Sequence, residues 1–110
     1  MVGYKFKPAQ PEAASLTAVT TGTGRAIPMQ DCRYTVWTVE GSGTITGGTV
    51  LIETADTMDY AGTWHALDTV SAAAGAYNKG IDAAGAGFIR ARVSSNVTGG
   101  GNITVRINGL

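Results

Sequence analysis

Period-two alternation in the second half of the chain is the feature that most constrains its fold. Residues 87–94 read GFIRARVS and residues 103–108 read ITVRIN. Successive side chains of a strand point to opposite faces, so each segment builds one apolar face and one mixed or polar face. We expect the apolar members to point inward: Ile89, Ala91, Val93, Ile103, Val105 and Ile107. The outer faces then carry the remaining members: Phe88, Arg90, Arg92, Thr104 and Arg106.

Three earlier segments have the same character. Residues 33–40 (RYTVWTVE), 49–54 (TVLIET) and 63–70 (TWHALDTV) are rich in the β-branched and aromatic residues that suit a pleated sheet. In the last segment, alternation is expected to separate two sets of side chains, one on each face: Trp64, Ala66 and a residue near Asp68 against His65, Leu67 and Thr69.

Weaker patterns lie before and between these strands. Shorter strands are expected at residues 16–20, 25–29 and 44–46. The Ala- and Gly-rich segment after residue 70 is expected to be an irregular connection with one short strand near residues 77–81. For the start of the chain, a short helix over residues 12–18 is the alternative to a strand.

Glycine residues mark the predicted turns between the strands. The 110 residues include 16 glycines, which separate short segments rich in Thr and Val. About seven or eight strands at roughly ten-residue spacing indicate an all-β chain, folded as an antiparallel β-sandwich of jelly-roll or immunoglobulin-like type. We expect residues 15–110 to form this single domain. Residues 1–14 contain Pro8 and Pro11 without periodicity, which favours an extended N-terminal arm.

Charge is balanced over the whole chain but not along it. Eight basic and eight acidic residues give zero net charge, so nucleic acid is not an expected partner. No segment approaches the ~20 apolar residues of a membrane span, so a membrane is not expected either. Every charge between residues 34 and 78 is acidic, whereas four of the five from residue 79 onward are basic. The two segments could form complementary faces of an oligomer or pair with each other within one fold.

Groups for catalysis or metal binding are scarce. Cys32 and His65 are the single cysteine and histidine, too few for a typical structural zinc site. No nucleophile signature surrounds them, so we expect neither enzymatic activity nor a cofactor. Asp56 and Asp59 flank a predicted turn, where their carboxylates could hold Ca²⁺ or shape the turn itself.

Two groups of side chains are candidates for binding. Arginine and aromatic residues are enriched where proteins bind one another. The candidates for a protein interface come from the arm, from one face of the strand at 87–94, and from the last strand, where Arg106 is expected to lie beside that face. They are Lys5, Phe6, Lys7, Phe88, Arg90, Arg92 and Arg106. Candidates for a sugar-binding platform, which could equally fill the core, are three aromatic residues: Trp37, Tyr60 and Trp64.

The order of motifs along the chain carries a resemblance. The motifs are TGGTVLIE at 46–53, the Asp-bearing loop at 56–59, GTWHAL at 62–67, FIRARVS at 88–94 and GGNITV at 100–105. In this order the chain resembles small β-sandwich proteins of tailed-bacteriophage virions, including capsid decoration (cement) proteins and modules of head or tail fibres. The resemblance implies a structural protein on the capsid surface, assembled in the host cytoplasm and bound to the major capsid protein, commonly as a homotrimer. The alternative it implies is a glycan- or receptor-binding module of a fibre.

Overall fold

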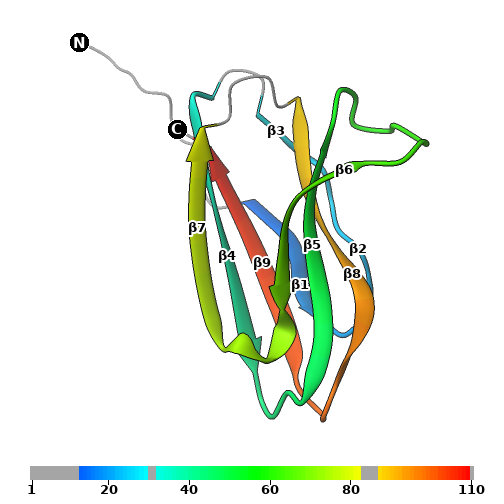
Figure 1. The fold of residues 1–110 in the computed structure, drawn as a ribbon, viewed down its shortest axis with the longest axis vertical. Coiled ribbons are helices and arrows are strands. Elements are labelled where there is room, and N and C mark those ends of the chain that lie inside the picture. The colour runs from blue at the N-terminus through cyan, green and yellow to red at the C-terminus, as the bar shows by residue number, and fades with distance from the viewer. Residues whose placement is uncertain (1–12, 30–31, 83–86, 110) are drawn as a thin grey trace.

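The computed structural model describes residues 13–29, 32–82 and 87–109, which form nine strands and one 3₁₀ turn (Figure 1). The elements are, in chain order, β1 (Ala13–Val19), β2 (Gly22–Thr23), β3 (Ile27–Pro28), β4 (Tyr34–Ser42), β5 (Gly47–Ala55), β6 (His65–Ser71), η1 (Ala72–Ala74), β7 (Ala76–Asp82), β8 (Phe88–Thr98) and β9 (Asn102–Gly109).

The strands form two antiparallel sheets that pack together as a sandwich (Figure 1). The first sheet has the order β1-β9-β4-β7, and the second has the order β2-β8-β5-β6, with β3 also pairing with β8. The predicted all-β antiparallel sandwich is confirmed. The described strands outnumber the expected seven or eight because β2 and β3 are separate two-residue strands.

The alternation of β8 and β9 builds the core as predicted. Along β9, buried residues alternate with half-exposed ones, and the six inward side chains of the two strands are all buried. They meet Trp37 and Val39 of β4 and Val50 and Ile52 of β5 in one cluster between the sheets. Burial of this apolar surface, at about 25 cal/mol per Å², supplies the main favourable contribution to folding.

Strand β6 departs from strict alternation because it contains a bulge. Ile52 of β5 pairs with Asp68, but the next residue, Glu53, pairs with Ala66, so Leu67 is an extra residue on β6. Directly opposed residues of an antiparallel pair point to the same side, and an inserted residue reverses the alternation. Asp68 therefore lies on the core side of the sheet and Ala66 on the outer side. By the same pairing, His65 lies opposite Thr54 and Thr69 opposite Leu51, so the prediction that His65 and Thr69 share a face is wrong.

Three weaker predictions also change. Residues 13–19 form strand β1, so the helical alternative at the start of the chain is wrong. Residues 44–46 form no strand. Strand β7 extends slightly beyond the predicted 77–81, following the 3₁₀ turn, which Ser71 caps by accepting a hydrogen bond from the backbone N–H of Ala73 at 3.2 Å.

The predicted arm lies almost wholly outside the described residues. Of residues 1–14, only Ala13 and Ala14 are described, and both belong to β1, where they pair with β9. The interface candidates Lys5, Phe6 and Lys7 fall outside the described part of the chain. Within the described ranges, no helix has the length and apolar character that a membrane crossing requires.

Candidate binding site

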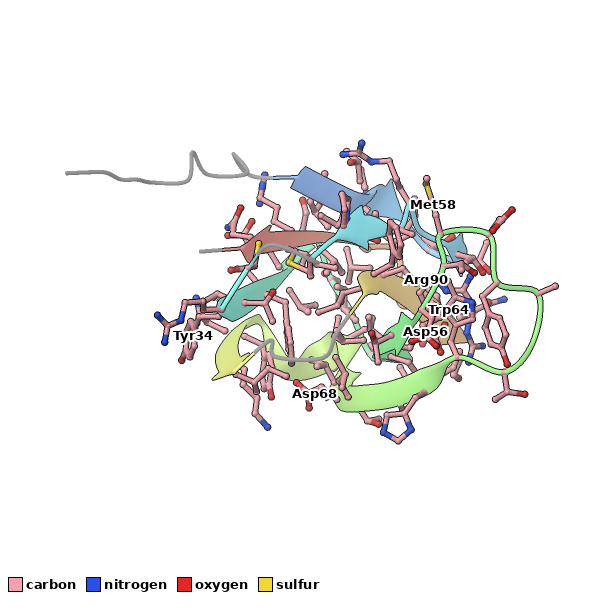
Figure 2. All side chains as sticks on the ribbon, turned by 90° about the horizontal axis from the view of Figure 1, so that it is seen from above. Tyr34, Asp56, Met58, Trp64, Asp68 and Arg90 are labelled. Carbon is pink, nitrogen blue, oxygen red and sulfur yellow. The ribbon has the colours of Figure 1, made fainter. Side chains whose placement is uncertain are left out.

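The segment that joins β5 to β6, residues 56–64, projects beyond the sandwich and is here called the β5–β6 loop (Figure 1). Three large hydrophobic side chains are exposed among the described residues, and two belong to this loop. Met58 is 59% exposed and Tyr60 is 46% exposed, whereas the third, Tyr34, is on β4. Figure 2 places Met58 and Tyr34 at opposite sides of the molecule. The exposed apolar surface is therefore concentrated on one hairpin.

Trp64 anchors the base of this loop. Its indole N–H donates a hydrogen bond to the backbone carbonyl of Tyr60 at 2.9 Å, and its side chain is buried. The guanidinium carbon of Arg90 lies 4.0 Å from the centre of the Trp64 ring, which is a cation–π arrangement; both residues are labelled in Figure 2. The loop also contains a turn, in which the N–H of Tyr60 donates to the carbonyl of Thr57 at 3.3 Å. These contacts hold the exposed side chains on a defined support.

The arginines next to the loop are paired with a buried carboxylate. Glu53 is only 2% exposed and accepts hydrogen bonds from Nε of Arg90 at 2.9 Å and from Nε of Arg92 at 3.1 Å. A carboxylate buried this deeply requires such partners to offset the loss of its water. Arg106 pairs with Glu40 at 2.8 Å on the other sheet. Two acidic residues of the middle segment thus pair with three arginines of the end of the chain within one fold.

This pairing revises the predicted interface face. Phe88, Arg90 and Arg92 do share the outer face of β8, as predicted. The expectation that Arg106 lies beside them is wrong, because β9 belongs to the first sheet and β8 to the second. Strand β9 follows β8 directly in the chain, and only the sheet order reveals that the chain crosses between layers.

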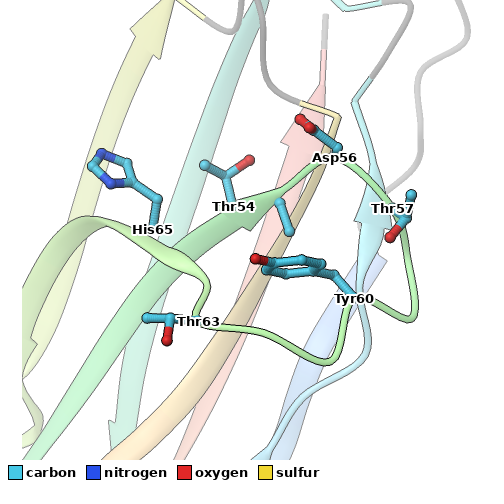
Figure 3. A pocket seen from close by; sticks show the side chains of 7 residues that line it. Thr54, Asp56, Thr57, Tyr60, Thr63 and His65 are labelled. Carbon is cyan, nitrogen blue, oxygen red and sulfur yellow. The ribbon is translucent and has the colours of Figure 1, made fainter.

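A cleft of about 480 Å³ lies between the β5–β6 loop and the ends of its two strands (Figure 3). Its polar lining consists of Thr54, Asp56, Thr57, Tyr60, Thr63 and His65. The hairpin register brings two lining residues of the cleft together, because Thr54 of β5 pairs directly with His65 of β6. The Thr54 hydroxyl donates to the carbonyl of Phe88 at 2.8 Å.

Gly62 shapes the floor of the loop under the Tyr60 ring. A Cβ at this position would collide with the Tyr60 ring, so only glycine lets the ring lie against the loop. Figure 3 shows the ring facing the middle of the cleft. The orientation of Tyr60 is therefore set on one side by Gly62 and at its backbone by Trp64.

The predicted platform of three aromatic residues does not form. Trp37 is fully buried between the sheets, where its indole N–H donates to a carboxylate oxygen of Asp68 at 2.9 Å. Trp64 is 6% exposed. The core alternative therefore holds for both tryptophans, and of the three residues only Tyr60 is available at the surface.

The acidic and nucleophilic candidates differ in how far their side chains are exposed to solvent. Asp56, Asp59 and His65 are exposed, whereas Cys32 is buried against Gly109. Within the described ranges, no cluster of three or more His, Cys, Asp or Glu side chains is arranged to hold a metal ion. Asp56 lines the cleft, while the choice between calcium binding and turn formation for Asp56 and Asp59 stays a prediction.

The threonines of the cleft were missed in the sequence. Thr54, Thr57 and Thr63 have no motif in common, and they meet only because a hairpin folds residues 54 and 65 opposite each other. The available signal was a tight segment with Asp and Gly residues, flanked by threonines, between two strands.

Comparisons of the chain with protein-family models, with curated proteins and with solved structures found no significant match.

Proposed function

We propose that this protein is a non-catalytic assembly module that binds the surface of a viral capsid as a decoration protein. The observation that carries the proposal is the β5–β6 loop, which presents Met58 and Tyr60 outside the sandwich on an anchored hairpin. The resemblance to β-sandwich proteins of tailed-phage virions supports the choice of a capsid as the partner.

Docking through this loop is physically reasonable. Moving the exposed Met58 and Tyr60 side chains out of water is favourable in proportion to the apolar area that is covered. A loop held by Trp64 loses little conformational freedom when it binds. The entropic cost of ordering the loop therefore offsets less of the favourable free energy of apolar burial.

The charges of the scaffold fit an apolar contact. Arg90 and Arg92 are engaged by Glu53, and Arg106 by Glu40. These three paired arginines add little electrostatic attraction to a partner, so the charge at the contact itself comes from the exposed Asp56 and Asp59 of the β5–β6 loop. We therefore expect any salt dependence of capsid binding to come from these two loop carboxylates.

The remaining parts of the proposal concern assembly. The partner is the major capsid protein, the protein acts as a homo-oligomer with a trimer favoured, and it joins the virion in the host cytoplasm. Lys5, Phe6 and Lys7 of the arm are proposed to contact a neighbouring subunit. Neither nucleic acid nor a membrane has a role. Sedimentation equilibrium of the full chain tests the trimer directly, since a monomer at every concentration would remove that part.

The central experiment measures binding of the purified full chain to capsids of the encoding phage that lack it. Wild-type protein is expected to bind saturably, and Met58→Ser to bind at least about tenfold more weakly, since roughly 1.5 kcal/mol or more of apolar burial is lost. Tyr34→Ser, at the opposite side of the molecule, is the matched control and is expected to bind like the wild type. Absence of saturable wild-type binding would overturn the proposal, and equal losses in both variants would remove the loop as the contact.

A further inference from the structure

We infer that the cleft under the β5–β6 loop is a binding site for one neutral, hydroxyl-rich ring, such as the terminal sugar of a glycan. The inference does not rest on the capsid role, because Met58, which tests that role, does not line the cleft. It replaces the predicted platform of Trp37, Tyr60 and Trp64 with a site that only Tyr60 of these three residues lines.

The dimensions of the cleft suit a ligand of this size. Small-molecule sites typically measure about 300–1,000 Å³ and combine an aromatic surface with a few placed polar groups. This cleft has a volume of about 480 Å³ and is open to solvent on one side. A single ring can enter while the rest of a glycan chain stays in water.

Tyr60 supplies the apolar contact. The negative face of an aromatic ring attracts weakly positive C–H groups, which the flat face of a sugar ring presents. The Tyr60 ring is 46% exposed, lies against Gly62 and faces the cleft (Figure 3). The backbone carbonyl of Tyr60 is held by the Trp64 indole N–H, so little backbone freedom is lost on binding.

The polar groups of the cleft select a ligand that donates hydrogen bonds. The Thr54 hydroxyl proton is committed to the carbonyl of Phe88, so its oxygen faces a ligand as an acceptor. The Asp56 carboxylate is also an acceptor. Thr57 and Thr63 each offer a hydroxyl that can donate and accept. Ligand hydroxyl groups, which donate and accept, match this set.

The charge of the lining argues against anionic ligands. Proteins recognise phosphate and carboxylate groups mainly with arginine and lysine, and neither lines the cleft, whose one basic side chain is that of His65. Arg90 and Arg92 are nearby in the fold but are paired with Glu53. Asp56 would repel a negative group. The site therefore favours neutral sugars over sialic acid, uronic acids or phosphosugars.

The experiment uses the full chain on an array of neutral and sialylated glycans, followed by NMR titration with methyl hexosides and with N-acetylneuraminic acid. We expect binding to neutral terminal sugars and none to the acidic ligand. Tyr60→Ala and the near-isosteric Thr63→Val are each expected to weaken binding at least about fivefold. Gly62→Ala replaces no lining residue but displaces the Tyr60 ring, so it should weaken binding as well.

Two controls separate this site from the capsid contact. Met58→Ser is expected to retain sugar binding, and Asp59→Asn, an exposed change in the same loop outside the lining, is expected to retain it too. Circular dichroism confirms that each variant is folded. No binding to any neutral sugar at millimolar concentration would overturn the inference, as would preferential binding of the acidic ligand or unchanged affinity in both Tyr60→Ala and Thr63→Val.

Discussion

At the scale of single residues, Glu53 is the buried charged side chain among the described residues, and its burial costs hydration energy. It is a carboxylate at 2% exposure that holds two arginines on the outer face of the second sheet. Glu40 pairs with Arg106 at a similar distance, but its side chain is 51% exposed. The two pairs therefore provide a matched test of how burial changes the contribution of an ion pair to stability.

We predict that Glu53→Ala lowers the free energy of unfolding by about 3 kcal/mol, because the variant leaves two neighbouring arginines without their partner. Glu40→Ala is expected to cost less than about 1 kcal/mol, as exposed ion pairs do. Urea denaturation of both variants measures the difference. Equal losses of unfolding free energy in the two variants would show that the burial of Glu53 does not strengthen the contribution of its ion pairs to stability.

Tyr77 carries a pH-dependent contribution. Its hydroxyl donates to Asp68 at 2.8 Å, and this hydrogen bond, with desolvation and the negative charge of Asp68, raises the pKa of Tyr77 above its usual value of 10.0. The folded state thus favours the protonated phenol more than the unfolded state does. Its stabilising contribution is complete below pH 10.0 and is lost as the pH rises through the raised pKa.

We predict that Tm of the wild-type protein falls more steeply above pH ~10 than Tm of Tyr77→Phe, which has no phenol to ionise. Thermal melts followed by circular dichroism at several pH values from about 8 to 11 measure both curves. Parallel curves for the two proteins would contradict the assigned role of Tyr77.

At the scale of elements, the β5–β6 hairpin depends on one side chain at its base. Trp64 donates to the carbonyl of Tyr60 and packs under Arg90. Trp64→Phe keeps an aromatic ring under the guanidinium but removes the N–H. We predict a stability loss of about 1 kcal/mol, together with faster proteolysis within residues 56–63.

Trp37→Phe is the contrasting variant for this test. It also removes an indole hydrogen bond, in this case to Asp68, but from the core between the sheets. It should lower global stability without directing cleavage to the loop. Protease digestion with mass spectrometry locates the cuts, and identical cleavage patterns in the two variants would argue against a local anchor.

The elements also explain how far the sequence predicts this fold. Regular alternation in β8 and β9 identified Ile89 and Ile107 as core residues, because period-two patterning needs no knowledge of the partner strand. In β6 the same rule misplaced His65 relative to Thr69, because the bulge at Leu67 is defined by pairing with β5. Local pattern determines which residues form strands, whereas register depends on contacts distant in sequence.

The candidate site was less predictable for the same reason. Tyr60 was identified from its residue type, but Thr54 and Thr63 join it only through the hairpin register. Trp37 and Trp64 were equally compatible with a surface platform and with burial. Their burial follows from Asp68 and Arg90, two partners that lie far from them in sequence or on another strand.

At the scale of the whole molecule, polar side chains connect the two sheets along both sides of the sandwich. On one side, the buried Ser15 of β1 donates to the carbonyl of Arg25 at 2.7 Å and accepts from the N–H of Ala91 on β8 at 2.9 Å. On the other side, Asp68 of β6 accepts from Trp37 of the opposite sheet. Strands β1 and β6 lie at opposite edges of the sandwich, so the two connections share no partner.

We predict that Ser15→Ala and Asp68→Ala each lower the free energy of unfolding by about 1–3 kcal/mol, because each leaves buried polar groups without a partner. Since the sites are independent, the double variant should lose the sum to within about 0.5 kcal/mol. Ser95→Ala, an exposed change on β8, is the control and should cost less than about 0.5 kcal/mol. Chemical denaturation of the four proteins completes the cycle. A coupling energy above about 1 kcal/mol would mean that the two edges act as one unit, so that each sheet transmits the loss of one connection to the other.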